Sequence, residues 1–386
     1  MRLICLTLAL CLLLSSAVAE TATATDLPEV NVRLENAGLE LMGHRVAYPR
    51  LAGMEDEALQ ALINRRIEEA AGAAEWTARL SGALTLENKL QCGWSAEILG
   101  SVLSCVFTRT GPLRTARYEE EASSLLVSLT TGEAYTLGSL FAEAESGAEA
   151  LNEALWEIAA TLSPMLPAAD LSPAPEAFAL TQGGVVLYYP SERFQTLAGH
   201  AGRLRLSFAE LGPALLDTSA DGVLAISGLV PEREEAAALI AQAVEKGMLP
   251  GVPAALGDPV AELTAAYGLA IDPDYYDGGR YVTLEDGLFH GVLVMTDRLY
   301  EKDLSQSLVN GLRADAFSLW GLHTGLTAVA QWRELLGEPD ATAQVTPAQA
   351  EAMRLAPGQS DYYHFGGHTL RLHADEEGVL RTIIIR

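Results

Sequence analysis

Three histidines near the C-terminus are the residues whose types and spacing most suggest chemistry. His364, His368 and His373 lie close together, with Asp361 and Asp375 on either side. Imidazole nitrogens and carboxylate oxygens are ligands of protein zinc sites, so this set could hold a metal ion. We favour the alternative that these side chains lie half-exposed on strand ends and turns. We therefore predict neither a metal site nor a cofactor.

Catalytic motifs are absent from the sequence. His364 and His368 have the spacing of the histidine pair of deacetylases, but the Asp-Asp motif that opens that domain is missing. The sequence contains no Gly-x-Ser-x-Gly elbow, no phosphate-binding loop and no His-Glu-x-x-His motif. We predict a non-catalytic protein. The alternative is a cell-wall hydrolase or deacetylase-type enzyme whose carboxylate or metal site the sequence does not locate.

Two segments carry candidate binding residues. Tyr275 and Tyr276 stand beside the glycine pair Gly278-Gly279, as aromatic residues do in sugar-binding loops, although we favour packing of strand tyrosines on a helix. The segment RTARYEEE, residues 114–121, interrupts two strand patterns and predicts a charged loop. Its candidate binding residues are Arg117, Tyr118, Glu119, Glu120 and Glu121.

Two cysteines lie outside the apolar N-terminal run. Alternating apolar and polar residues end at Cys92, and Leu103, Cys105 and Phe107 share one face of the next predicted strand. Pairing Cys92 opposite Cys105 puts the turn at Glu97–Gly100 and both thiols on one buried face. We therefore predict a structural disulfide between Cys92 and Cys105, which would stabilise the fold by about 3 kcal/mol.

The N-terminus predicts an extracytoplasmic location. Arg2 precedes an apolar run from Leu3 to Leu14, and Ala17-Val18-Ala19 fits the small-residue rule for cleavage. We predict a signal peptide at residues 1–19, a flexible leader at residues 20–38, and a secreted or periplasmic mature chain without a membrane span. The alternative is an uncleaved anchor, for which the run is short.

The charge balance limits the class of partner. The formal net charge is -26 at pH 7, which argues against nucleic acid and against anionic membrane surfaces. A cationic protein partner is compatible with this charge, and so is a simple solubilising role, which we favour. With 49% hydrophobic residues the chain can build ordinary cores, and the sequence leaves the oligomeric state open.

Helical and strand patterns alternate along residues 39–216 and predict a pair of α+β domains, with helices packed on one face of antiparallel sheets. Predicted helices span residues 54–74 and 147–162. Predicted strands lie at residues 39–48, 84–92, 103–107, 125–129, 178–181, 185–189 and 204–208.

A linker and a weak internal repeat make up the second part. Residues 217–250 predict a linker with a short strand at 223–226 and a helix at 232–246. Residues 251–386 predict a smaller α+β domain with two copies of one unit, about 257–295 and 321–386. Asp274-Tyr275-Tyr276 in the first copy matches Asp361-Tyr362-Tyr363 in the second, which carries an insertion near residues 341–360.

Residues 40–215 resemble a known family through features that follow one another in a fixed order. These are YPRLAGMEDEALQALINRRIEEA, LSCVF, SLTTGEAYTLGSLF, FALTQGGVVLYYPSE and LRLSFAEL. In this order they resemble the ectodomain family of the anti-sigma factor RsiV and the non-catalytic domains of the peptidoglycan deacetylase PdaC. The resemblance implies an α+β fold, and its best-understood member binds lysozyme and thereby controls a sigma factor.

The chain departs from that family in two places. Only Met1-Arg2 precede the apolar run, which argues against direct control of a sigma factor. Residues 117–121 replace a Gly-Ala-His segment of many members. The C-terminal repeat is similar to the β-lactamase inhibitor protein fold, which implies a binding surface. We therefore expect a secreted binding protein of the cell envelope whose partner is a lysozyme-like cationic muramidase or a wall glycan such as peptidoglycan.

Overall fold

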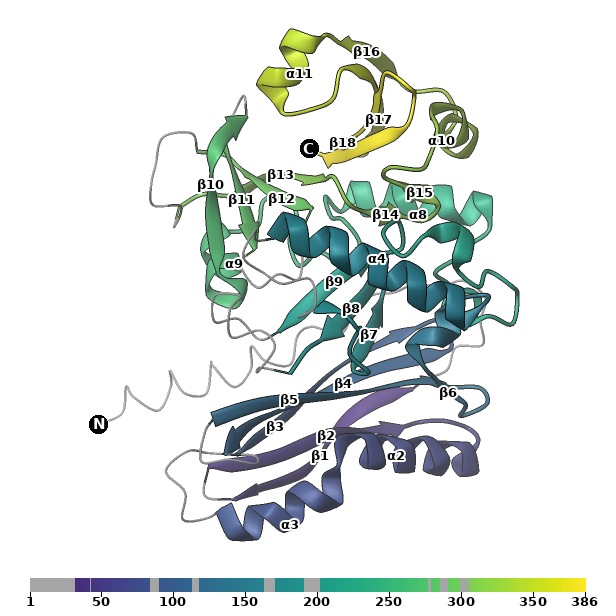
Figure 1. Cartoon of the computed structure of the whole chain (residues 1–386), viewed down its shortest axis with the longest axis vertical. Helices are drawn as coiled ribbons and strands as arrows, with labels where there is room; N and C mark the ends of the chain where they lie inside the picture. The colour runs from purple at the N-terminus through teal and green to yellow at the C-terminus, as the bar shows by residue number, and fades with distance from the viewer. Residues whose placement is uncertain are drawn as a thin grey trace.

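Three sheets stack along the long axis of the molecule. The structure, a computed structural model, describes residues 32–41, 43–83, 90–112, 118–162, 171–190, 202–276, 279–284, 291–298, 304 and 306–386. A six-stranded sheet lies at the bottom of Figure 1, a three-stranded sheet in the middle and an eight-stranded sheet at the top. Helices and largely antiparallel strands confirm the α+β class, while the predicted signal peptide lies outside the described residues.

The six-stranded sheet follows chain order and carries two helices on its outer face (Figure 1). Its elements are β1 Arg33–Leu41, β2 His44–Ala52, β3 Gln91–Leu99, β4 Val102–Pro112, β5 Tyr118–Ser128, β6 Ala134–Tyr135, α2 Glu57–Ala71 and α3 Ala73–Ala83. The flexible leader predicted as far as residue 38 is wrong at its end, because β1 begins at Arg33. The charged loop predicted to residue 121 is also wrong at its end, because β5 begins at Tyr118.

The first predicted helix is observed as α2, and side chains explain both its ends. The Asp56 carboxylate accepts hydrogen bonds from the Ala58 and Leu59 amides, both at 2.9 Å, which caps the helix N-terminus. Gly72 ends the helix with φ 62°, a left-handed conformation that glycine adopts without steric penalty. Buried Asn64 accepts from the Leu51 amide and donates to the Leu51 carbonyl, so it fastens α2 to β2.

The register of β3 against β4 overturns the predicted disulfide. Cys92 lies opposite Arg109, and Cys105 lies opposite Ala96, so the two cysteines are offset by four positions along the hairpin. At about 3.3 Å per residue this is about 13 Å, beyond the reach of a disulfide. Both cysteines are buried, free thiols. The prediction that both cysteines lie on one face of the hairpin is confirmed. That property is shared by the observed register and the predicted one, so it does not distinguish them.

Thiol labelling should show two buried, unpaired cysteines. Burial raises the pKa of Cys92 to about 11 and that of Cys105 to about 12, so neither forms the reactive thiolate at pH 8. We expect iodoacetamide to leave the native, unreduced mature chain unmodified and to alkylate both positions once urea unfolds it. Intact mass before and after unfolding measures this. A chain that takes up iodoacetamide in urea only after reduction would contradict it.

The middle layer packs on the other face of the six-stranded sheet. Its elements are β7 Phe178–Thr181, β8 Gly184–Tyr188, β9 Arg203–Ser207, α4 Ala144–Leu162, and the single turns η1 Leu137–Leu140 and η2 Pro213–Leu215. The Ser104 and Ser124 hydroxyls accept hydrogen bonds from the Leu180 and Phe178 amides at 3.0 Å, which joins β7 to β4 and β5. Within the described ranges, no helix is long and apolar enough to cross a membrane.

Two helices connect this layer to the C-terminal sheet. They are α7 Val223–Ile226 and α8 Arg233–Glu245. The predicted helix at 232–246 is confirmed as α8, whereas the short strand predicted at 223–226 is wrong, because that segment forms the single turn α7. The apolar residues Val223 and Leu224 are buried, so a brief apolar run here indicated burial without distinguishing strand from helix.

Both predicted repeat copies contribute to one eight-stranded sheet, ordered β10-β11-β12-β13-β19-β18-β17-β16. The strands are β10 Leu269–Tyr276, β11 Gly279–Leu284, β12 Val292–Thr296, β13 Val309–Ala314, β16 Ala341–Val345, β17 Gly358–Phe365, β18 His368–Asp375 and β19 Leu380–Ile385. The helices are α9 Val260–Tyr267, α10 Val329–Leu336 and α11 Pro347–Met353. A small hairpin of β14 Ser318–Leu319 and β15 Leu322–His323 lies at the start of the second copy. The predicted insertion supplies β16 and α11.

Candidate functional site

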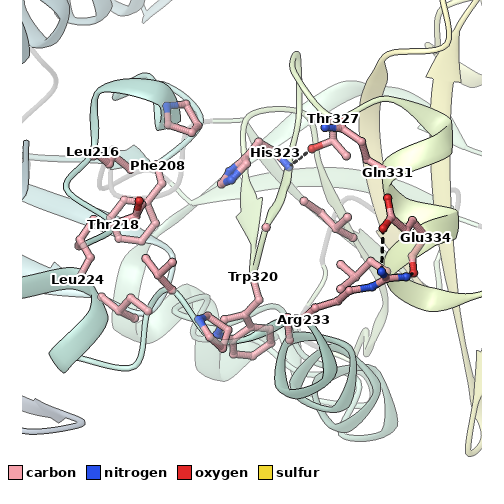
Figure 2. Close-up of a pocket in the computed structure, with 18 residues that line it drawn as sticks. Phe208, Leu216, Thr218, Leu224, Arg233, Trp320, His323, Thr327, Gln331 and Glu334 are labelled. Carbon is pink, nitrogen blue, oxygen red and sulfur yellow. Dashed lines mark hydrogen bonds and ion pairs between the residues drawn. The ribbon is translucent and has the colours of Figure 1, made fainter. Parts of the chain in front are cut away.

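A pocket of about 460 Å³ lies where the connecting segment meets the C-terminal domain. Its wall comes from residues 208–236 on one side and from the β14–β15 hairpin and α10 on the other (Figure 2). Most of the lining is apolar, contributed by Phe208, Pro213, Leu216, Leu224, Leu229, Val230, Pro231, Ala236, Leu322 and Leu335. This volume and a mostly apolar wall with few polar groups are typical of a small-molecule site.

Trp320 occupies an unusual backbone conformation at the tip of the hairpin. Its φ is 37°, and Gly321 follows with φ 87°, so both central residues of this two-residue turn have positive φ. Asn, Asp and Gly are the usual residues of such a turn, and a bulky residue there is strained by about 1–3 kcal/mol. The indole lines the pocket, and its N–H donates no hydrogen bond to a residue that the structure describes. This strain presents an aromatic ring to the pocket.

His323 is held neutral at the other end of the hairpin. Its Nδ1 lies 2.8 Å from the Ser318 hydroxyl, which also accepts a hydrogen bond from the Ala209 amide at 2.7 Å. Because the Ser318 oxygen already accepts from Ala209, we assign the Ser318 hydroxyl as the donor to Nδ1. The hydrogen of the neutral imidazole then lies on Nε2. Burial lowers the pKa of His323 to about 4, so the ring carries no charge at neutral pH. Within the described chain, Nε2 has no hydrogen-bond partner.

An exposed ion pair closes one side of the pocket. Arg233 on α8 donates to the Glu334 carboxylate at 2.7 Å and to the Glu334 main-chain carbonyl, bridging α8 and α10 (Figure 2). Both side chains are more than half exposed, so the pair contributes little to stability and is available to a ligand. The side-chain oxygen Oε1 of Gln331 accepts a hydrogen bond from the Ala328 main-chain amide at 2.7 Å, which leaves the side-chain NH₂ group of Gln331 as a further donor.

These groups favour a neutral ligand rich in hydroxyl groups. The charges of Arg233 and Glu334 cancel, and neutral His323 adds none, so the pocket offers donors and a carboxylate acceptor without net charge. Glycoside hydrolysis needs two carboxyl groups, whereas Glu334 is the only carboxylate among the described residues that line the pocket. Ser318 is buried with its hydroxyl engaged, so it is not placed as a nucleophile. The arrangement can bind and orient a ligand.

Acidification is expected to destabilise the chain through His323. Its pKa is about 4 in the folded chain and about 6.5 when unfolded, so the unfolded chain binds more protons between these values. The free energy of unfolding should therefore fall by about 2–3 kcal/mol as the pH falls from 7 to 4. The His323→Gln variant keeps an acceptor for Ser318, and its free energy of unfolding should fall less over the same pH range. Urea unfolding of both proteins at the two pH values measures the difference.

Other groups that titrate in this range cancel in that comparison. Burial raises the pKa of Glu97 to about 7, which opposes the His323 effect, and burial lowers the pKa of His373, which acts in the same sense. Both groups are present in the wild-type chain and in the variant. An equal loss of stability in the two proteins would therefore contradict the role assigned to His323.

The three C-terminal histidines are not brought together. His364 pairs with Thr369 across the β17–β18 hairpin and His368 pairs with Phe365, so Gly366-Gly367 turns the chain and puts these histidines on opposite faces. His373 is fully buried, with Nδ1 2.9 Å from the Ser360 hydroxyl and Nε2 2.8 Å from the Ala356 carbonyl. The described residues contain no cluster of three or more potential metal ligands.

The predicted binding residues lie away from this pocket. Arg117 falls outside the described residues. Tyr118, Glu119 and Glu120 are the first three residues of β5 and pair with residues 110–112 of β4. Glu121 is half-buried opposite Arg109. Tyr275 belongs to β10, where the structure does not describe its side chain.

Buried Tyr276 makes hydrogen bonds to the Thr296 carbonyl and, at 3.1 Å, to Asn310. Tyr363, which the repeat aligns with it, instead lies in the core and donates to the Gly337 carbonyl at 3.1 Å. The packing interpretation of these tyrosines therefore fits both positions.

The pocket residues were not identified from the sequence. Arg233 and Glu334 lie a hundred residues apart, and nothing in the intervening pattern predicts that α8 and α10 meet. One weak local signal was available: Gly321 lies within a short segment in which Phe317, Leu319 and Leu322 are apolar. Glycine at the second position of a two-residue loop is typical of a tight hairpin, whereas tryptophan at the first position is not.

Comparison with known proteins gives similarities to solved structures. No protein-family model and no curated protein matches the sequence. The chain is similar to the crystal structure of a DUF4309 family protein, YjgB, from Bacillus subtilis, with 12% identity and a TM-score of 0.26 over 40% of this chain and 96% of that one.

It is also similar to crystal structures of two DUF3298 family proteins. One is from Bacteroides fragilis, with 12% identity and a TM-score of 0.32 over 52% of this chain and 97% of that one. The other is from Pseudomonas aeruginosa, with 13% identity and a TM-score of 0.32 over 49% and 95%. These values identify no family and no function for this chain, and the resemblance to the RsiV ectodomain family stays a prediction.

Proposed function

We propose that the chain is a secreted, non-catalytic binding protein of the cell envelope whose pocket takes a sugar residue of a wall glycan. The observation that supports this most is Trp320, held at positive φ beside the pocket that neutral His323 and the Arg233–Glu334 pair also line. A sugar ring has an apolar face for the indole and hydroxyl groups for the surrounding donors and the Glu334 carboxylate. The N-terminal apolar run motivates the extracytoplasmic location.

Titration calorimetry with soluble peptidoglycan fragments tests this function. The mature chain should bind muramidase-released glycan fragments saturably and should release neither reducing sugar nor acetate from them. A linear glucan of similar length serves as the control ligand, because it lacks the N-acetyl groups of wall glycan. Absence of binding to the wall fragments at millimolar concentration, or turnover of them, would contradict the proposal.

A cationic protein is the second candidate partner, favoured by an acidic stripe on α4. Glu145, Glu149, Glu153 and Glu157 recur every fourth residue and are all exposed, beside Trp156, whose side chain is 57% exposed. Like charges at this spacing destabilise a helix by about 0.2–0.5 kcal/mol per pair, and a basic partner would remove that repulsion. Figure 1 shows α4 lying across the front of the molecule.

Pull-down with a basic muramidase separates this candidate from the first. Retention should decrease as salt rises and should be lost when Glu149 and Glu153 are changed to Gln together. The same double variant should bind glycan fragments like the wild type, because neither residue lines the pocket. Equal retention of wild type and double variant would exclude the stripe as the contact surface.

A further inference from the structure

Arginines stack on tyrosines along the face of the eight-stranded sheet opposite to its helix-covered core. The core face packs Leu370, Leu372 and Ile383 with residues of α8 and α10, whereas Ile384 belongs to the other face. On that other face the Cζ atoms of four arginines lie over tyrosine rings. Arg313 and Arg354 lie over Tyr281 at 5.6 and 5.7 Å, Arg371 over Tyr362 at 5.6 Å and Arg386 over Tyr276 at 5.1 Å. We call these residues the arginine–tyrosine face.

Strand register brings the arginines together. Arg313 on β13 and Arg371 on β18 both pair with Ile384 of the intervening β19. Arg386 exchanges both main-chain hydrogen bonds with Thr369, at 2.6 and 3.0 Å. Thr369 precedes Arg371 by two positions, so Arg371 and Arg386 are diagonal neighbours on one face, with Cα atoms about 7–8 Å apart.

Positive charge on this face is only partly neutralised. Arg313 is buried and binds Asp315 through Nε, at 3.0 Å from both carboxylate oxygens. Arg371 is half-buried and Arg386 exposed, and neither forms an ion pair with any residue in the described ranges. The Nε of Arg371 donates to Ser360 at 3.0 Å, while its two terminal nitrogens lie 3.8 and 4.0 Å from the Met353 sulfur.

Mutual repulsion adds to this imbalance. Burial lowers the pKa of the Arg371 guanidinium, Tyr362 opposes that effect, and the charges of Arg313 and Arg386 lower the pKa further. The chain as a whole is acidic, with a net charge of -26. A carboxylate placed on Arg371 and Arg386 would relieve their repulsion in the same way that Asp315 already neutralises Arg313.

We propose that the arginine–tyrosine face binds an acidic peptide segment in extended conformation, with carboxylates of alternate residues on Arg371 and Arg386. Alternate side chains of a strand point to one side and lie about 6.6–6.8 Å apart, which matches the diagonal spacing of these arginines. Arginine pairs with carboxylates through two parallel hydrogen bonds, and Asp315 shows that the face accommodates a carboxylate. Half-buried Tyr362, which lies under Arg371, is the tyrosine of this face that a partner can reach, whereas Tyr276 and Tyr281 are buried beneath the arginines.

Fluorescence anisotropy with the full mature chain tests this binding. The probe is a short labelled peptide of alternating glutamate and serine, compared with inorganic polyphosphate and with a peptide of equal charge whose glutamates are contiguous. Salt of about 0.15 M gives a Debye length of about 8 Å and screens the remote acidic surface. The wild type should bind the alternating peptide at least threefold more tightly than the contiguous one and at least tenfold more tightly than polyphosphate.

Three variants decide whether Arg371 is responsible. Arg371→Gln should weaken binding of the alternating peptide at least tenfold, and Arg371→Lys at least threefold, because lysine keeps the charge but not the planar fork. Arg381→Gln is the matched control: Arg381 lies on β19 but pairs with Asp375 at 2.6 Å, outside the face, so affinity should change less than twofold. If Arg371→Gln fails to fold, Arg371→Lys carries the test. Equal binding by wild type and Arg371→Lys, or equal affinity for polyphosphate and peptide, would overturn the proposal.

Discussion

Trp320→Asn is expected to lower the affinity of the pocket for wall-glycan fragments by about a hundredfold while leaving the fold intact. The indole supplies the flat apolar surface and an N–H donor without a partner in the described chain. Asn adopts positive φ more readily than tryptophan, and Asn-Gly is a favoured pair for a two-residue hairpin turn. The hairpin should therefore persist, with its ring removed. Titration calorimetry and thermal unfolding of the same preparation measure both effects.

An exposed tryptophan elsewhere provides the matched control. Trp156 on α4 is 57% exposed and does not line the pocket, so Trp156→Asn makes the same chemical change at an unrelated surface. Its glycan affinity should equal that of the wild type. Unchanged affinity in Trp320→Asn, or equal losses in both variants, would remove the indole from the proposed site.

Local patterns in the sequence predicted most elements because the hydrophobic period decides them. The strand at Phe178–Thr181 and the helix ending at Leu162 have the predicted C-terminal limits. Leu103, Cys105 and Phe107 share one buried face with α2, as their alternation predicts. Such elements carry their own signal, since burial of one face imposes a period of two or 3.6 residues.

Strand register was not available from the same signal. Every register that shifts the β3–β4 pairing by an even number of residues keeps Cys92 and Cys105 on one face. The turn decides among these registers. It lies at Gly100-Ser101, two residues beyond the turn that pairing Cys92 with Cys105 requires, and this displacement offsets the two cysteines by four positions. The repeat also shows that the sequence pattern does not determine register. The register of β10 shifts between Ile271 and Tyr275, and Tyr276 lies in a different apolar cluster from Tyr363, the residue that the repeat aligns with it.

The pocket depends on contacts that no periodic pattern encodes. Its polar groups come from α8, the β14–β15 hairpin and α10, which come together only in the folded chain. Trp320 also breaks the local preference for Asn or Gly at its position. A residue that opposes its own backbone preference is informative, because the surrounding structure has to hold it there.

Asp361→Ala is expected to destabilise the chain by about 3–5 kcal/mol. Asp361 is fully buried and accepts hydrogen bonds from Trp332 at 3.0 Å, from Arg333 at 2.7 and 2.9 Å, from Thr342 at 2.9 Å and from Gln359 at 2.9 Å. Its removal leaves the indole N–H of buried Trp332 without an acceptor and separates α10 from β16 and β17. Urea unfolding at pH 7 measures the loss of stability.

The Asp361→Asn variant shows whether the charge of Asp361 or its hydrogen bonds contribute more to stability, and Glu35→Ala is the control. Burial raises the pKa of Asp361, but hydrogen bonds from Arg333, Trp332, Thr342 and Gln359 outweigh it and the pKa lies below its ordinary value of 3.8. The stability that this carboxylate contributes is therefore present above the unfolded-state pKa and is lost as the pH falls through the lower folded-state value. Asp361→Asn should accordingly differ most from the wild type at pH 7, and the difference should shrink as the pH falls below the ordinary value of 3.8 toward the lower folded-state pKa. Glu35→Ala, which breaks the exposed Arg33–Glu35 pair, should change stability by less than about 1 kcal/mol over the same pH range. A constant difference between Asp361→Asn and the wild type across this range would mean that the hydrogen bonds of Asp361, and not its charge, hold α10 to the sheet.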